Sequence, residues 1–215
     1  MPKQHKSESS QAELHPVSCR ACDMFELCEW AEQQRRMPGI HRAVLRTLSR
    51  NEPLTDIADS SFFFAVRKGL LKATRTSVLG RKRVSHVYVP GDLIPAELLQ
   101  AGPAAIEVVA VTDAMVCDLD KDTVANICKT EPSSHVAVHW LLARSHKDRV
   151  FAHDGHCAAK LDQFLKRISN RLRARGLEDM DVLAHLSQQD VADILQSNRS
   201  AVRQAVKALE RPAMI

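Results

Sequence analysis

The sequence lacks the features that would direct the chain into or across a membrane. Residues 1–7 are polar and charged, and no apolar core of a secretory signal follows them. No stretch has the roughly 20 apolar residues that a membrane-spanning helix requires. We therefore expect a cytoplasmic protein with no membrane partner, in which cysteine thiols remain reduced.

The sequence also lacks the short motifs of common enzyme classes. It contains no Gly-rich nucleotide loop, no H-E-x-x-H and no G-x-S-x-G. The formal net charge of +4 suits an anionic partner without requiring one. We therefore expect a protein that is not an enzyme, and its 215 residues can form one large domain or two small ones.

The first two thirds of the chain change from a polar leader to a β-rich region. Residues 1–18 are polar and poor in apolar side chains, which predicts a flexible leader. A cysteine-rich stretch follows, and then a basic segment with some helical periodicity through Val44, Leu45 and Leu48. Between about Leu54 and Leu119, short apolar runs end at Gly or Pro turns, which predicts a small antiparallel barrel or roll.

The remainder of the chain has helical periodicity. Ser133 or Ser134 can cap a long helix that runs toward Phe151. Further helices are expected at Cys157–Arg175, ended by Gly176, and at Gln188–Leu195 and Arg199–Glu210. The predicted fold class is α+β, with a leader at 1–18, an antiparallel β-roll domain at 19–132, a long helix at 133–156 and a helix-turn-helix domain at 157–215.

Four cysteines have a spacing that suits an inorganic centre. Cys19, Cys22 and Cys28 form C-x2-C-x5-C, and Cys117 lies far along the chain in a predicted strand. Two intervening residues let the first two thiolates face one inorganic core, and five give the third enough slack to reach it. Four thiolates are the usual ligands of an iron–sulfur cluster, so this set predicts a cluster site.

Other interpretations of these cysteines remain open. Structural zinc also takes four thiolates, although its sites more often contain two closely spaced pairs. Free thiols and redox cysteines are further alternatives, and Cys117 alone would be a small buried hydrophobic residue. Cys128 and Cys157 have no partner at ligand-like spacing and are expected to be structural.

The last two helices have the pattern of a DNA-reading pair. Ser187 is a plausible N-cap, Ala192 is small enough for a close helix crossing, and apolar residues can pack between the helices: Val191, Leu195, Val202, Val206 and Leu209. The polar face of the second helix carries Arg199, Ser200, Arg203, Gln204 and Lys207. Arg can bind guanine and Gln adenine in a major groove, while Lys and Ser suit phosphates. A solvated amphipathic hairpin is the alternative.

The order of these segments resembles the CRP/FNR family of bacterial transcription regulators, and most closely its branch of fumarate and nitrate reduction regulators. The resemblance runs from Cys19 to Ile215. It rests on the cysteine spacing with distal Cys117 and on three further stretches: Arg67-Lys68-Gly69-Leu70-Leu71-Lys72, Pro90-Gly91-Asp92-Leu93-Ile94 and Leu186-Ser187-Gln188-Gln189-Asp190-Val191-Ala192.

This resemblance implies an oxygen-sensing [4Fe–4S] cluster on Cys19, Cys22, Cys28 and Cys117. It implies a cupin-like jelly roll as the sensor domain and a homodimer formed through the long helix. It further implies a winged-type helix-turn-helix that binds double-stranded DNA, and RNA polymerase as a partner. The polar stretch from Arg144 to Arg149 either weakens the dimer seam or faces solvent.

Some positions differ from the family pattern. Ala104-Ala105 stands where cAMP-binding members have an Arg-Ser pair, so we expect no cyclic nucleotide to bind. Ser200 and Gln204 replace the usual Glu and Arg of the recognition helix, which predicts an altered DNA half-site. Gln196 occupies a turn position that favours Gly, where a left-handed backbone costs about 1 kcal/mol. The chain ends where the wing would begin, so the wing is expected to be missing.

A second class of function stays open. An iron–sulfur electron carrier or redox protein would use the same cysteines while the terminal helices served only as structure. Reversible redox cycling without affinity for DNA would distinguish it from a regulator.

Overall fold

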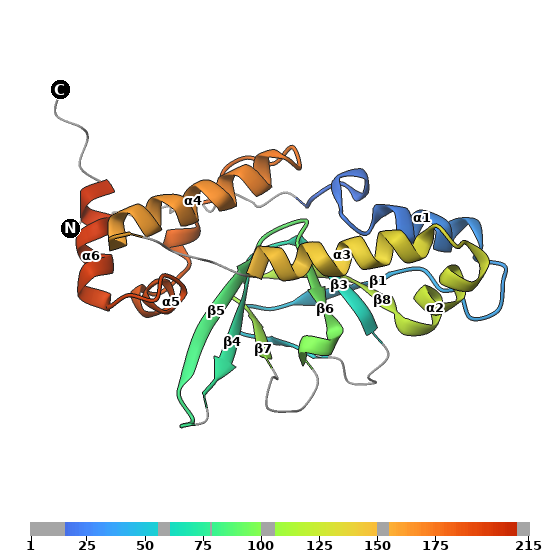
Figure 1. The fold of residues 1–215 in the computed structure, drawn as a ribbon, viewed down its shortest axis with the longest axis horizontal. Coiled ribbons are helices and arrows are strands. Elements are labelled where there is room, and N and C mark those ends of the chain that lie inside the picture. Colours follow the sequence, from blue (N-terminus) through green and yellow to red (C-terminus); the bar gives the residue numbers. More distant parts are fainter. Residues whose placement is uncertain (1–15, 56–60, 78, 100–105, 150–154, 210–215) are drawn as a thin grey trace, which may run out of the picture.

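The computed structural model describes residues 16–55, 61–77, 79–99, 106–149 and 155–209. A β-roll forms the centre of the molecule, helices lie along one side of it, and a helical unit lies at one end (Figure 1). The chain is therefore a mixture of helices and an antiparallel β-roll, as predicted. None of the described helices is long and apolar enough to cross a membrane.

The roll consists of two antiparallel four-stranded sheets. One has the strand order β1-β8-β3-β6 and the other β2-β7-β4-β5. The strands are β1 (Val44–Leu48), β2 (Pro53–Leu54), β3 (Ser61–Lys68), β4 (Leu71–Thr76), β5 (Lys82–Tyr88), β6 (Leu93–Pro95), β7 (Ile106–Ala110) and β8 (Ala114–Asp120). Large buried side chains such as Phe64, Leu71, Tyr88 and Ile94 form the core between the sheets.

The helical periodicity predicted through Val44 and Leu48 is wrong, because this segment is strand β1. It pairs with β8 along its whole length, and Leu45 lies opposite Cys117. Leu48 enters the core of the roll, whereas Val44 and Leu45 are exposed. Pairing with β8 supplies the hydrogen bonds that an isolated helix would have made internally, so tertiary context overrides the local pattern.

Two helices beside the roll were not expected. Helix α1 (Phe25–Gln33) follows a short 3-10 helix, η1 (Cys19–Ala21), and α2 (Lys121–Thr130) follows β8. The Asp120 side chain caps α2 by accepting from the Thr123 N–H at 2.7 Å. Asp is a preferred N-cap residue, so Asp120 at the end of a strand could have predicted the start of α2.

The helices of the second half lie close to where the periodicity placed them. They are α3 (Ser134–Arg149), α4 (Cys157–Arg173), α5 (Gln188–Ile194) and α6 (Arg199–Leu209), with the short 3-10 helices η2 (Ala96–Leu99) and η3 (Val182–Ala184). Gly176 has a φ of +69° and follows the end of α4, as expected. The expectations about Ala104-Ala105 and about the wing concern residues outside the described part of the chain.

The terminal helix pair has the predicted local chemistry. Ser187 and Asp190 form a reciprocal capping box at the start of α5. Gln196 has a φ of +48°, which confirms the left-handed turn. Val191, Ala192, Leu195 and Val202 are buried between the helices and against α4, whereas Leu209 is exposed and the expectation that it packs there is wrong.

Candidate functional site

The first segment of the chain brings three cysteines to the outer face of the roll. Cys19 begins η1, Cys22 ends it, and Cys28 lies in α1. The segment is tied to β3 because the Val17 N–H donates to the Arg67 carbonyl at 2.8 Å, and Val17 is fully buried. Strand alternation places Cys117 of β8 on this same outer face, since its neighbour Val116 points into the core of the roll.

The four cysteines lie close enough for their charges to shift one another's pKa. The pKa of Cys28 is raised to about 12, mainly by burial and also by the charges of Cys22, Cys117 and Cys19. Burial likewise raises the pKa of Cys22 to about 11, and Cys117 contributes to that rise. The pKa of Cys117 is raised by burial and by Cys19, against the opposing charge of Arg67. The structure therefore brings together all four cysteines that the spacing selected.

Arg67 is the cation of this cysteine site, and the sequence did not single it out as a functional residue. Its Nη1 donates to Cys19 Sγ at 2.7 Å, and its charge lowers the pKa of Cys22, Cys28 and Cys117. Arg67 lies two residues after Ala65 in β3, and both face the cysteine-bearing segment outside the roll. A guanidinium here stabilises thiolates, or an anionic group bound by them, over the neutral thiols.

The four thiols are donors that both zinc and an iron–sulfur cluster accept. Among the described residues, no three His, Cys, Asp or Glu side chains are arranged to hold one metal ion. A zinc ion needs its four sulfurs about 2.3 Å from one point. A [4Fe–4S] cluster gives each thiolate its own iron, so its ligands surround a volume. Cys22, Cys28 and Cys117 are half-buried, Cys19 is exposed, and Arg67 lies against Cys19, so the donors are of the chemical type that a cluster takes.

Asp23, between Cys22 and Cys28, joins the cysteine site to two distant helices. Its Oδ1 lies 3.2 Å from Arg144 Nη1 on α3. Its Oδ2 accepts from Arg175 Nη2 at 3.1 Å, just beyond α4. Arg175 is only 5% exposed and also donates to Asp92 of the roll at 3.0 Å. Sequence reasoning missed this network because its members lie far apart in the chain.

The network continues along α4. Arg171 Nη1 donates to Asp92 Oδ2 at 2.8 Å. The buried carboxylate of Asp92 therefore binds both Arg171 in α4 and Arg175 just after that helix. Asp92 also accepts from the Val89 N–H at 2.8 Å within the Pro90-Gly91 turn. This turn, predicted from the sequence as a simple break, is therefore the anchor of the C-terminal helices on the roll.

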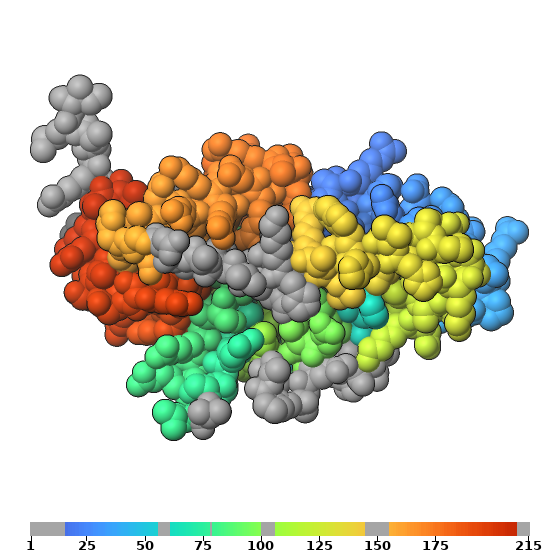
Figure 2. Space-filling model, in the orientation of Figure 1, coloured from blue at the N-terminus to red at the C-terminus, as the bar shows by residue number. Residues whose placement is uncertain are grey.

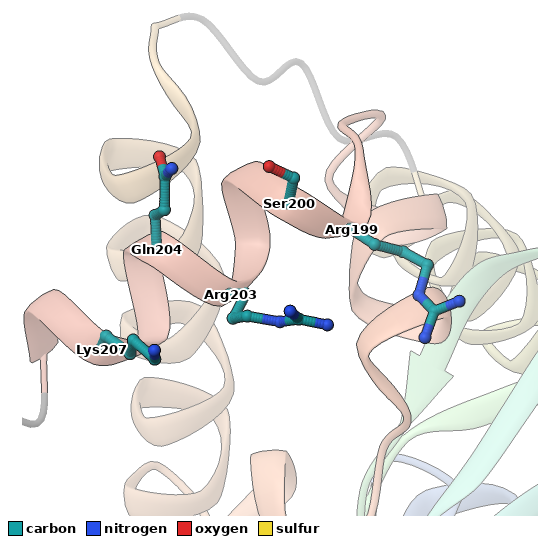
Figure 3. Close-up of a pocket in the computed structure, with 5 residues that line it drawn as sticks. All are labelled: Arg199, Ser200, Arg203, Gln204 and Lys207. Carbon is teal, nitrogen blue, oxygen red and sulfur yellow. The ribbon is translucent and has the colours of Figure 1, made fainter.

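The second candidate site is the outward face of α6. Figure 3 shows Arg199, Ser200, Arg203, Gln204 and Lys207 projecting from successive turns of this helix. All five side chains are exposed, and they line a shallow concavity of about 540 Å³. Val202 and Ala205 on the opposite side of α6 are buried. The structure therefore brings the five predicted residues together on one accessible helix surface of polar and basic character.

Comparison with known proteins defines the class of the roll. Residues 45–131, from β1 through α2, match the family model of the cyclic nucleotide-binding domain. The roll is therefore similar to a cyclic nucleotide-binding domain, and the arrangement of the roll with its helices matches the fold of solved structures. The match concerns the fold, and the expectation that no cyclic nucleotide binds stays a prediction.

Relatives of the whole chain are regulatory proteins. An anaerobic regulatory protein of Haemophilus influenzae is 20% identical over 187 residues, which cover 83% of this chain and 73% of the relative. An anaerobic regulatory protein of Pasteurella multocida is 17% identical over 207 residues, covering 93% of this chain and 76% of the relative.

Two solved structures share the fold. FixK2 from Bradyrhizobium japonicum has a TM-score of 0.62 and 16% identity, covering 79% of this chain and 85% of that chain. A cyclic nucleotide-binding domain containing protein from Listeria monocytogenes has a TM-score of 0.59 and 14% identity, covering 86% and 90%. Both matches extend beyond the roll into the helices that follow it.

Proposed function

We propose that this protein is a DNA-binding transcription regulator in which a [4Fe–4S] cluster controls dimerisation and promoter binding in response to oxygen. The observation that carries the proposal is the gathering of Cys19, Cys22, Cys28 and Cys117 beside Arg67, with Asp23 of the same loop bound to two other helices. The regulatory proteins among the relatives support the general class.

The four cysteines are the proposed cluster ligands. The bound cluster would supply a group that oxygen degrades, while the chain holds it through thiolates at neutral pH. Because burial raises the pKa of Cys22 and Cys28, binding must displace their protons. Arg67 lowers the cost of gathering negative charge at this site, since it already lies against Cys19.

Asp23 is the proposed route from the cluster loop to the rest of the molecule. Its carboxylate binds Arg144 on α3 and Arg175 after α4, so movement of the loop changes the contacts of both helices. Loss of the cluster removes the constraint on the loop that carries Asp23. This supplies a coupling free energy between the cluster site and the helices that dimerise and bind DNA.

Helix α3 is the proposed dimer seam. Val136 is 71% exposed and Trp140 is 60% exposed, and the two lie one turn apart on the same face. Leu141 on the other side is buried against the cysteine-bearing segment and the roll. Large apolar side chains in solvent are favoured at an interface, so a second copy of this helix is the proposed partner. Arg144 stacks over Trp140 at 5.4 Å and adds a polar edge to that face.

Helix α6 is the proposed DNA-reading element. Its exposed Arg203 and Gln204 have donors suited to base edges, and Arg199, Ser200 and Lys207 suit phosphates. A homodimer would present two such helices to successive major grooves of double-stranded DNA.

The test compares the parent protein with Cys22→Ala and Cys128→Ala, all purified without oxygen. Cys128 is a matched control because it is half-buried near the same core and is not a proposed ligand. We expect iron, acid-labile sulfide and DNA binding in the parent and in Cys128→Ala, with loss of all three in Cys22→Ala. Exposure to air should bleach the visible absorption of the parent and weaken its DNA binding.

Three results would contradict the proposal. Zinc in place of iron would indicate a different kind of regulator. Reversible redox cycling with no affinity for DNA at any salt concentration would indicate an electron carrier. If Cys22→Ala bound DNA as well as the parent, with and without air, the sensing function would be wrong.

A further inference from the structure

A groove lies between the β4–β5 hairpin and the helical unit that contains α5 and the start of α6. The hairpin of β4 and β5 projects from the roll beside α5 (Figure 1), and the surface of the helical unit meets that of the hairpin strands (Figure 2). The groove between them has a volume of about 1090 Å³. Its walls are residues of the hairpin on one side, and α5, the following turn and Arg199 on the other.

The hairpin wall is strongly basic. Arg75, Arg81 and Arg83 line the groove, are exposed and have no salt bridge within the described part of the chain. Lys82 also lines it but is paired with Glu107 at 2.6 Å. Across the groove, Arg199 is exposed at the start of α6. Four guanidinium groups thus face one open space, and their mutual repulsion favours an anionic occupant.

Asp193 is the acidic residue among those that line the groove, and it leaves the lining with an excess of positive charge. Asp193 Oδ2 accepts from the Val84 N–H of β5 at 3.2 Å, and its Oδ1 accepts from Gln189. Asp190 is paired with Lys72 of β4 at 3.0 Å. These contacts fasten α5 to the hairpin, so the hairpin arginines are held at a set position relative to α6.

Arg199 connects this groove to the recognition face. It lines the groove together with the hairpin arginines, and it also lines the concavity of α6 with Arg203 and Lys207. Arg199 is therefore common to the polar and basic face of α6 and to the groove that the hairpin arginines line. A ligand that covers the α6 face and continues past Arg199 meets the hairpin next.

We propose that the β4–β5 hairpin is a second DNA contact, in which Arg75, Arg81 and Arg83 bind backbone phosphates flanking the base pairs that α6 reads. The inference rests on the proposed DNA-binding function. Arginine forks bind phosphate oxygens bidentately and read no bases there, so the hairpin adds affinity and fixes orientation without adding sequence specificity.

The test measures how DNA affinity depends on salt. The anaerobic full-length parent, Arg83→Gln and the triple variant Arg75→Gln/Arg81→Gln/Arg83→Gln are titrated onto a mixed-sequence DNA duplex between about 50 and 200 mM salt. Each phosphate contact contributes about −0.9 to the slope of log K against log salt. We expect the slope to become shallower by about 1 for Arg83→Gln and by about 2 to 3 for the triple variant.

Arg36→Gln is the matched control, because it removes one exposed positive charge just after α1. Helices α1 and α6 lie at opposite ends of the molecule (Figure 1), so its slope should equal that of the parent. Arg75, Arg81 and Arg83 are exposed, and circular dichroism should show unchanged folding in every variant.

The outcomes separate the two proposals. A parent that binds no DNA overturns the proposed function itself. A parent that binds DNA while the triple variant keeps the parental slope overturns only the hairpin contact. An equal change of slope in Arg36→Gln and Arg83→Gln also overturns it, because the effect would then be that of net charge.

Discussion

Arg175 Nη2 lies 3.1 Å from Asp23 Oδ2, and this contact joins the end of α4 to the loop between Cys22 and Cys28. Burial would lower the pKa of Arg175, but the charges of Asp92 and Asp23 outweigh burial and the pKa is raised. The guanidinium therefore remains charged inside the protein. One buried cation holds the cysteine loop, the roll and the C-terminal helices together.

Replacing Asp23 with Asn should weaken this link without removing a cluster ligand. Arg175 keeps Asp92 but loses half of its charge partners, so the free energy of unfolding should fall by about 1–3 kcal/mol. Iron content should stay at the parental level. The ratio of DNA affinity before and after air exposure should shrink by at least about 5-fold, since typical coupling energies span that range. Anaerobic and aerobic DNA titrations measure it.

Asp162→Asn provides the control for that variant. Asp162 pairs with Lys166 at 2.8 Å on the surface of α4, where both side chains are largely exposed. Its loss should change neither stability nor the response to air. An Asp23→Asn protein that responds to air as the parent does would show that Asp23 carries no coupling.

Gly91→Ala should be far more damaging than Gly80→Ala, although both glycines have a left-handed backbone. The φ values are +90° and +75°, and each substitution incurs about 1–2 kcal/mol of backbone strain. A Cβ at Gly91 would also overlap Arg175 Cδ and Nε, whereas a Cβ at Gly80 meets nothing within 4 Å. We expect a further loss of about 1–3 kcal/mol at Gly91 from overpacking. Equal urea midpoints for the two variants would contradict the buried placement of Arg175.

Substitutions on α6 should separate base reading from phosphate binding. Arg203→Ala should weaken binding to a selected site by about 1–3 kcal/mol and relax sequence preference, while Lys207→Ala should weaken binding to all duplexes and reduce the salt slope by about 1. Both residues are exposed, so thermal stability should be unchanged. Parental affinity for every duplex in both variants would exclude α6 as the reading helix.

Alkylation should distinguish the cysteines of the metal-free protein. Because the pKa of Cys28 is raised from 9.0 to about 12, its thiolate fraction near pH 8 should be about 1000-fold below that of an ordinary thiol. Exposed Cys19 should react with iodoacetamide first, as mass spectrometry of the labelled peptides would show. In urea all the cysteines should react alike. A folded protein in which Cys28 reacts as fast as Cys19 would contradict the burial of the site.

The raised pKa of Cys28 also makes the free energy of unfolding depend on pH. The folded protein holds the Cys28 proton more tightly than the unfolded chain does, so the stabilisation is complete below the ordinary thiol pKa. It is lost as the pH rises from about 9 toward 12. Without a bound metal, the free energy of unfolding should therefore decline in that range.

Local chemistry explains which parts of the fold were predictable. Ser187 caps α5, Gly176 follows α4, and Gln196 takes a left-handed turn, each as the sequence indicates. The strand at Val44 was mistaken for a helix because its hydrogen-bond partner, β8, lies about 70 residues away along the chain. Helix α1 was not predicted. Its buried Leu27 packs in the core that contains Cys22, Cys28 and Cys117, and this core forms only when distant segments come together.

The sequence by itself determined the four cysteines, the basic face of α6 and the order of roll and helices, because spacing and periodicity are local properties. Only the tertiary structure decided that Arg67 lies against Cys19 and that Asp23 binds Arg144 and Arg175. It also decided that the β4–β5 hairpin lies beside α5. These contacts depend on how strands and helices distant in sequence pack, and no pattern within one segment encodes that packing.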